Sequence, residues 1–282
     1  MKRSVSPLIL FVIGAACTLG LAIWSVFGIG TDEAGLEMVA SIGAVGIAAV
    51  CSATVLLIAL SFPKAEPWRR QWLLVGLGIG AFALGNLARA GETAWGLDPI
   101  LTDVGLIAEY FLLGAALVAV GQAYVPMVDW RRPGFGAAGT GAAFLAVLWF
   151  GVIQPFVLPD AESVSAMVRT VAYPVADILL LVVPATFVSL CLAQIGGDRF
   201  ARPWWAVTFG VGVLALSQGA IIVLQAMPGA YYRGMFVDYG PVLSQVLVAM
   251  GALSAAALAV EFMWRPESAP VAESEPVSEP AG

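Results

Sequence analysis

The sequence contains no histidine, and its 282 residues include only two lysines and three cysteines. Without histidine the chain cannot form His-ligated haem, zinc sites of the zincin type, or Ser-His and Cys-His catalytic pairs. Lys2 and Lys64 flank the apolar runs, which excludes a retinal Schiff base inside a helix bundle. The Gly-x-Gly-Asp pattern of intramembrane aspartyl proteases is also missing. We therefore expect no enzyme activity, no catalytic residue, no metal and no cofactor.

Charged residues are scarce too, at 11% of the chain, whereas 60% of the residues are hydrophobic and the mean hydropathy is +0.92. Because soluble domains carry roughly a quarter of their residues as charges, this composition predicts an integral membrane protein. An apolar run of about 20 residues crosses the hydrocarbon as an α-helix, since a helix satisfies its own backbone hydrogen bonds. The sequence predicts an all-α fold of eight transmembrane helices, at about 8–29, 36–62, 71–90, 101–125, 135–157, 172–195, 203–226 and 237–264.

The first run and the cysteines both fit this assignment. The run at 8–29 is longer than the apolar region of a usual signal peptide and no Ala-x-Ala-like site follows it, so we expect an uncleaved helix. Cys17, Cys51 and Cys191 all fall inside predicted helices. They are expected to pack as small apolar side chains and not to form a disulfide framework.

The basic residues predict the orientation of the bundle, which we place at 1–265. Lys and Arg in short loops stay on the cytoplasmic side. With the N-terminus inside, only Arg89, Arg169 and Arg233 lie outside. The inside set is Lys2, Arg3, Lys64, Arg69, Arg70, Arg131, Arg132, Arg199, Arg202 and Arg265. Both ends of the bundle are therefore predicted to be cytoplasmic.

The net charge of −6 is concentrated on the predicted outer side, where acidic residues far outnumber arginines. An acidic surface does not suit nucleic acid, which requires a basic patch. The last residues, 266–282, contain four glutamates, four prolines and three serines but no aromatic residue. Such a segment cannot bury enough surface to fold, so we expect a disordered cytoplasmic tail.

The two halves of the bundle, 1–130 and 131–265, resemble each other. Sliding the sequence by 132 residues places 70–86 on 202–218 with seven identities in seventeen positions. At this shift Arg70 matches Arg202, Trp72 matches Trp204, and the amide Asn86 matches the amide Gln218. In the next helix pair, a shift of 135 residues matches Asp103-x-Gly105 with Asp238-x-Gly240. Two repeats of four helices each would share one orientation and be related by an axis along the membrane normal.

Polar residues of the membrane region gather in the predicted outer loops and the outer halves of helices. Glu109 lies about two turns inside the helix at 101–125, where a carboxylate is costly enough to need a reason. Asp103 and Tyr110 share one face of this helix, and Glu109 points roughly 120° away. We predict an outward-opening ligand pocket, with Arg89 or Arg169 pairing Glu109 or Asp177. Its residues are Arg89, Glu92, Trp95, Glu109, Tyr110, Arg169, Tyr173 and Asp177.

The alternative is that these polar groups only cap helices and hold the bundle together. Asp103 and Asp238 stand at predicted helix starts, where a carboxylate accepts hydrogen bonds from backbone N–H groups. We therefore assign these two aspartates as structural caps and not as ligand-binding residues.

Several short motifs resemble one family of membrane modules. They are Trp95, Asp103, Glu109-Tyr110-Phe111-Leu112-Leu113-Gly114, Tyr173-Pro174-x-x-Asp177-Ile178-Leu179-Leu180-Leu181, and Tyr231 to Asp238 before the last helix. This pattern resembles the multi-pass input module that precedes GGDEF/EAL cyclic-di-GMP enzymes and some histidine kinases in prokaryotes. In that family an acid and a tyrosine are paired in the fourth and the penultimate helix, whereas the penultimate helix here has Ser217-Gln218.

The resemblance implies a multi-pass sensor of the prokaryotic plasma (inner) membrane. Because the sequence ends about 17 residues after the bundle, we expect a stand-alone module without an output domain, which signals through a cytoplasmic or membrane partner. Two other classes stay open. The chain could be a structural or assembly subunit whose polar residues hold the bundle, or a small cation or solute transporter, which the repeat and the buried acids favour.

Overall fold

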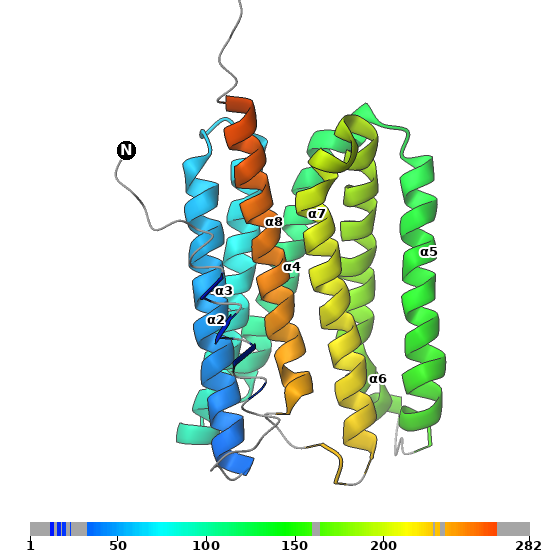
Figure 1. Cartoon of the computed structure of the whole chain (residues 1–282). Helices are drawn as coiled ribbons and strands as arrows, with labels where there is room; N and C mark the ends of the chain where they lie inside the picture. The colour runs from blue at the N-terminus through cyan, green and yellow to red at the C-terminus, as the bar shows by residue number, and fades with distance from the viewer. Residues whose placement is uncertain are drawn as a thin grey trace, which may run out of the picture.

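The computed structural model describes residues 12–13, 16–17, 19–20, 23, 33–159, 164–227, 229–231 and 235–263. Within these ranges the chain consists of helices and short turns and contains no strand (Figure 1). The prediction of an all-α fold is therefore confirmed for the described residues. The first predicted helix, 8–29, lies almost wholly outside them, and the predicted tail, 266–282, lies entirely outside them.

Six helical stretches of the described chain are long and apolar enough to cross a membrane. They are built from α2 (Glu33–Ser61), α3 (Pro67–Trp95), α4 (Ile100–Tyr124) with η1 (Val125–Met127), α5 (Arg131–Leu148) with η2 (Trp149–Val157), α6 (Val164–Ala176) with η3 (Asp177–Val182) and α7 (Val183–Ala226), and α8 (Gly240–Met263) with η4 (Phe236–Tyr239). This bears out the prediction of a membrane protein with several spanning helices.

One of these stretches, Thr170–Ala226, is 57 residues long and contains a break. The backbone leaves helical geometry at Gly196 (φ −128°, ψ 15°) and Gly197 (φ 66°, ψ −164°), which separates two helices within α7. A positive φ is readily adopted by glycine, which has no Cβ to clash. We call 183–195 the first leg of α7 and 198–226 its second leg. The two legs correspond to the predicted helices at 172–195 and 203–226.

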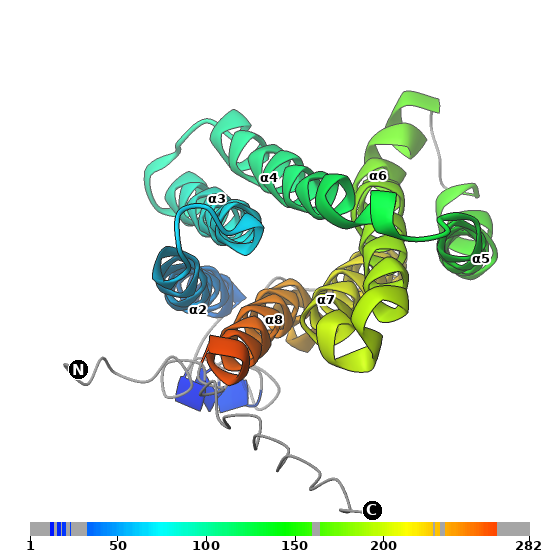
Figure 2. The ribbon, with the colours of Figure 1, turned by 90° about the horizontal axis from the view of Figure 1, so that it is seen from above.

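The helices form a ring around a common axis. Seen from above, α2, α3, α4, α6 with the first leg of α7, the second leg of α7, and α8 follow one another around it (Figure 2). Contacts between α4 and η3 and between α2 and α8 close the ring, and α5 packs on α7 from outside. Large apolar side chains such as Leu84, Phe111 and Phe209 are exposed on the outer surface, as expected for helices that face lipid.

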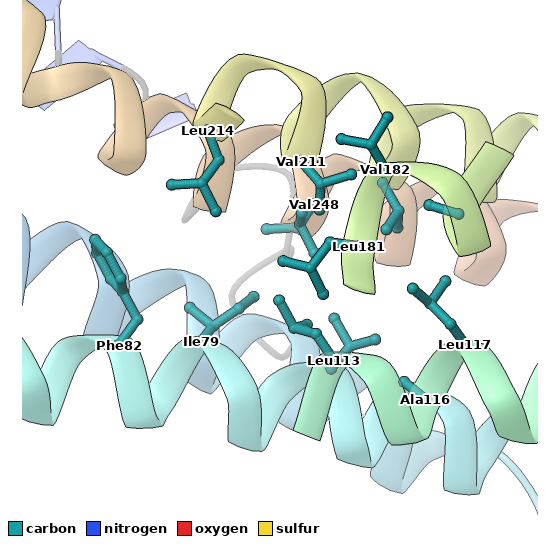
Figure 3. Close-up of a cluster of buried hydrophobic side chains, with 14 of the residues drawn as sticks. Ile79, Phe82, Leu113, Ala116, Leu117, Leu181, Val182, Val211, Leu214 and Val248 are labelled. Atoms are coloured by element: carbon teal, nitrogen blue, oxygen red, sulfur yellow. The ribbon is translucent and has the colours of Figure 1, made fainter. Parts of the chain in front are cut away.

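The core lies inside this ring. Figure 3 shows Ile79, Leu113 and Leu117 facing Leu181 and Val211 across the interior. Side chains from α3 and α4 thus meet those from η3 and α7, so that the two halves of the chain share a single core and do not form separate domains.

Two buried tryptophans close the interior near the end at which α2 ends and α3 begins, which we call the Trp72 end. The rings of Trp72 and Trp204 are stacked, with centroids 5.0 Å apart and planes 21° apart. Their side chains are 0% and 2% exposed. These tryptophans are related by the shift of 132, so matched positions of the two halves are in direct contact.

Helix contacts also recur at matched positions. A Cβ placed on Gly78 would lie 3.0 Å from Leu113 Cγ, which places α3 directly against α4. A Cβ on Gly210 would lie 2.9 Å from Val248 Cγ2, which places the second leg of α7 in the same way against α8. The shifts that relate these contacts, 132 and 135 residues, are those of the sequence comparison.

Candidate functional site

A cavity of about 310 Å³ lies between the helices of the ring at the end where α3 ends and α4 begins, which we call the Asp103 end. We call this cavity the ring pocket. Residues from α2, α3, α4, α6, α7 and α8 line it, together with Tyr231 and Asp238 from the segment before α8. Its polar residues are Glu37, Ser41, Asn86, Arg89, Thr170, Tyr173, Gln218, Gln225, Tyr231 and Asp238.

The ring pocket carries charges of both signs. Arg89 supplies one cationic group, while Glu37 and Asp238 supply two carboxyls. Asn86 and Gln218, which are matched positions of the two halves, add amide groups that both donate and accept hydrogen bonds. A pocket lined by these groups can bind a small molecule that carries both an ammonium and a carboxylate group.

A seam of tyrosines and acids joins α4 to α6 and η3 beside the pocket. The Tyr173 hydroxyl donates to Asp103 Oδ1 over 2.8 Å, and the Tyr110 hydroxyl donates to Asp177 Oδ1 over 2.5 Å. The two tyrosine rings lie with centroids 6.3 Å apart. Because Asp103 is exposed and Asp177 is 0% exposed, the seam runs from the bundle surface into its core.

A second buried contact spans the interior of the ring. Gln245 Nε2 of α8 donates to Glu109 Oε1 of α4 over 2.6 Å, and the two side chains are 1% and 3% exposed. Glu109 is nine residues beyond Ile100, the first residue of α4, or about 14 Å along the helix axis. This distance is about half the thickness of a hydrocarbon layer, which is roughly 30 Å.

The two buried carboxyls have only uncharged hydrogen-bond donors in the described part of the chain. These donors are Tyr110 for Asp177 and Gln245 for Glu109. An ionised carboxylate loses several kcal/mol of hydration on burial, whereas a hydrogen bond to a charged group returns about 1.5–3 kcal/mol. Two acceptor atoms, Asp177 Oδ2 and Gln245 Oε1, are buried without a hydrogen-bond partner.

The buried cluster of Glu109, Asp177 and Gln245 lies directly beneath the ring pocket. Each member stands about one helical turn deeper than a residue that lines the pocket. The lining residues are Leu106 above Glu109, Pro174 above Asp177, and Val242 above Gln245. We call Leu106, Pro174 and Val242 the pocket floor.

Asp177 also begins the π-helical segment η3. Pro184 follows this segment at the start of α7, and proline removes one N–H from the helical hydrogen-bond ladder. π-helical turns inside α-helices are frequent at functional sites. The π-helical segment that starts at Asp177 therefore supports this buried acid as part of a site.

Five of the predicted site residues lie in the ring pocket or in the buried network beneath it. Arg89 and Tyr173 line the ring pocket. Glu109, Tyr110 and Asp177 belong to the buried network beneath it.

The rest of the predicted residues lie elsewhere. Glu92 accepts a hydrogen bond from the Thr102 hydroxyl, and Trp95 is 76% exposed. Arg169 belongs to α6, but its side chain is outside the described part.

The two aspartates assigned as caps accept hydrogen bonds from tyrosines. Asp103, in the first turn of α4, accepts from Tyr173, and the backbone N–H at the helix start is instead bonded to Asp98 Oδ1. Asp238 accepts from the Tyr231 hydroxyl over 2.9 Å and lines the ring pocket. Their geometry thus places both residues beside the candidate site.

Sequence reasoning missed several residues of the site. These are Glu37, Asn86, Gln218 and Gln225 in the ring pocket, and Gln245 in the buried cluster. The signal that could have found the amides is their place in apolar helices, where a polar side chain is rare and tends to face the bundle interior. Glu37 gave no such signal, because it stands near a helix start where a solvated carboxylate is ordinary.

Comparison of the chain with protein-family models, with curated proteins and with solved structures finds no match in any of the three. The function is therefore inferred from the residues of the chain itself.

Proposed function

We propose that the chain is a sensory, ligand-binding module of the prokaryotic plasma membrane. Its ring pocket takes a small polar molecule from outside the cell, and the signal passes to a cytoplasmic or membrane partner. The observation that carries this proposal is the polar cavity of about 310 Å³ at the Asp103 end. Its volume falls within the range of small-molecule sites, roughly 300–1,000 Å³.

The proposal includes eight membrane spans with both ends of the bundle inside. The predicted helix at 8–29 supplies the first span, and the break at Gly196 and Gly197 supplies the turn between the sixth and the seventh. In this orientation the Asp103 end faces outward, because the loops at the Trp72 end hold most of the arginines and basic loops stay inside.

The proposal also includes two parallel repeats with an axis through the ring pocket. The stacked pair Trp72 and Trp204 supports this axis. So do Asn86 and Gln218, which are matched positions lining one cavity. A site between two repeats can respond to a ligand by a change in how the halves pack.

The lining of the ring pocket favours a small zwitterion. Arg89 can bind a carboxylate, and Glu37 or Asp238 can bind an ammonium group. The ligand would act on the module by binding one packing of the helices more tightly than another. Our candidate for the moving element is α6 with η3, since Tyr173 and Pro174 line the pocket and the irregular turn at Asp177 lies directly below them.

Blocking the pocket is expected to abolish binding without unfolding the protein. Ser41 lines the pocket on α2, so Ser41→Phe would fill space that the ligand needs. Its neighbour Ile42 is exposed on the lipid-facing side, which makes Ile42→Phe the matched control. The full chain in nanodiscs would be heated with each of the common free amino acids and with betaine as probes.

At least one probe should raise the melting temperature of the wild type and of Ile42→Phe but not of Ser41→Phe. Equal shifts in both variants would place the binding site elsewhere. No shift with any probe would favour a structural or assembly subunit.

Transport is the second candidate, because acids buried near mid-depth beneath an outward pocket are typical of substrate pathways. Uptake of a probe that binds, measured in proteoliposomes, separates the two functions. A sensor binds the probe without moving it into the vesicle, whereas a transporter accumulates or equilibrates it.

A further inference from the structure

We propose that Glu109, Asp177 and Gln245 form a binding site for a small monovalent cation, buried beneath the floor of the ring pocket. The site is separate from the ring pocket, because none of its three residues lines that cavity. It does not depend on the ligand or on the signalling role proposed above.

The first support is a surplus of acceptor atoms. Asp177 Oδ2 and Gln245 Oε1 are both buried and have no hydrogen-bond partner. Gln245 uses its amide nitrogen to bond Glu109, so its oxygen is the atom left to face another group. Buried oxygens without donors are the ligands that a hard cation selects.

The second support is charge. In the described part of the chain, Glu109 and Asp177 interact electrostatically with each other, and their hydrogen-bond donors, Gln245 and Tyr110, are neutral. If these carboxyls are ionised, the balancing charge comes from outside the three residues, and either a proton or a bound cation supplies it. An alkali cation fits because two carboxyl groups and one amide oxygen supply oxygen ligands and at most two negative charges.

Access to the site passes through the ring pocket. Leu106, Pro174 and Val242 line the pocket one turn above the cluster, and Pro174 precedes the irregular turn at Asp177. A cation that has shed most of its water needs only a small displacement of this floor. A ligand ammonium held in the pocket would stay above the floor and could not reach all three residues.

Within the described part of the chain, the rings of Trp72 and Trp204 are stacked and buried at the Trp72 end. The proposed entry is therefore from the Asp103 end, after the floor has moved.

The test uses the full chain without any pocket ligand. Its melting temperature would be measured in sodium, lithium, potassium and choline chloride at equal ionic strength and pH. At least one alkali cation should raise the melting temperature in a saturable way that choline does not reproduce. Binding of radioactive sodium to the purified protein, competed by the other cations, would measure the affinity directly.

Variants then assign the effect to the site. Asp177→Asn and Glu109→Gln keep the shape of each side chain and should remove the cation-dependent shift or weaken the affinity at least tenfold. Asp98→Asn makes the same chemical change at an exposed position and should leave the shift intact. If Asp177→Asn does not yield folded protein, Gln245→Met removes one oxygen ligand and leaves both carboxyls in place.

Two results would overturn the proposal. The first is a melting temperature that is the same in all four salts and responds only to pH, which would mean that protons alone neutralise the cluster. The second is a full cation-dependent shift in folded Asp177→Asn or Glu109→Gln.

Discussion

Replacing Gly105 with alanine is expected to lower the free energy of unfolding by about 1–3 kcal/mol, even though alanine is the better helix former. A Cβ at Gly105 would lie 2.5 Å from Gly85 Cα and 2.6 Å from Gly85 N. These are backbone atoms of α3, so no side chain can rotate away to relieve the clash. The variant must separate α3 from α4 and lose the packing that small residues provide between membrane helices.

Gly114→Ala is the matched control, since it makes the same change in the same helix where a Cβ would have no neighbour within 4 Å. It is expected to be neutral or to stabilise the protein by up to about 1 kcal/mol, because glycine is the poorer helix former. Unfolding of both variants in mixed micelles measures the difference. Equal changes in the two variants would contradict the close contact of α3 and α4.

Trp72→Ala is expected to cost more, about 3–5 kcal/mol, because it removes a large side chain from a closed site. Trp72 is 0% exposed and stacks on Trp204, so the change leaves a cavity and also ends an aromatic contact worth about 0.5–1.5 kcal/mol. Trp72→Phe keeps an aromatic ring in place and should lose much less.

Trp95→Ala is the control for this prediction, because Trp95 is largely exposed at the Asp103 end. Its free energy of unfolding should change by less than about 0.5 kcal/mol. A small loss in Trp72→Ala, similar to that of Trp95→Ala, would show that the two halves do not meet at the stacked pair.

The helices could be predicted from sequence because hydrocarbon leaves the backbone few alternatives to a helix. The apolar runs at 36–62 and 101–125 differ by only a few residues from α2 and α4. The break between the helices predicted at 172–195 and 203–226 is also expected, because paired glycines mark a turn. What could not be predicted is its short length, since only Gly196 and Gly197 leave helical geometry and the helix resumes directly after them.

The site could be predicted only as far as faces of single helices. Helical periodicity places Asp103 and Tyr110 on one face, and the structure shows that face meeting Tyr173 and Asp177. Periodicity does not reveal which helices are neighbours, so the partner of Glu109 could not be named. The donor that the structure gives Glu109 is Gln245, from the far side of the ring.

The matched halves differ where the buried cluster lies. At a shift of 135, Glu109 matches Ser244 and Tyr110 matches Gln245. Each half supplies one acid of the cluster, Glu109 from the first and Asp177 from the second, but the shift does not match these two positions. The proposed cation site is therefore a single site built from unmatched residues of both halves.

Cysteine accessibility tests the outward ring pocket most directly. The native Cys17, Cys51 and Cys191 would first be replaced, and Ser41→Cys or Ile42→Cys introduced on that background. Ser41 lines the pocket, whereas Ile42 is exposed on the lipid-facing side. A charged, membrane-impermeant thiol reagent added to intact cells is predicted to label Ser41→Cys and not Ile42→Cys. Labelling of Ser41→Cys only after the inner face is exposed, or not at all, would contradict a pocket that opens outward.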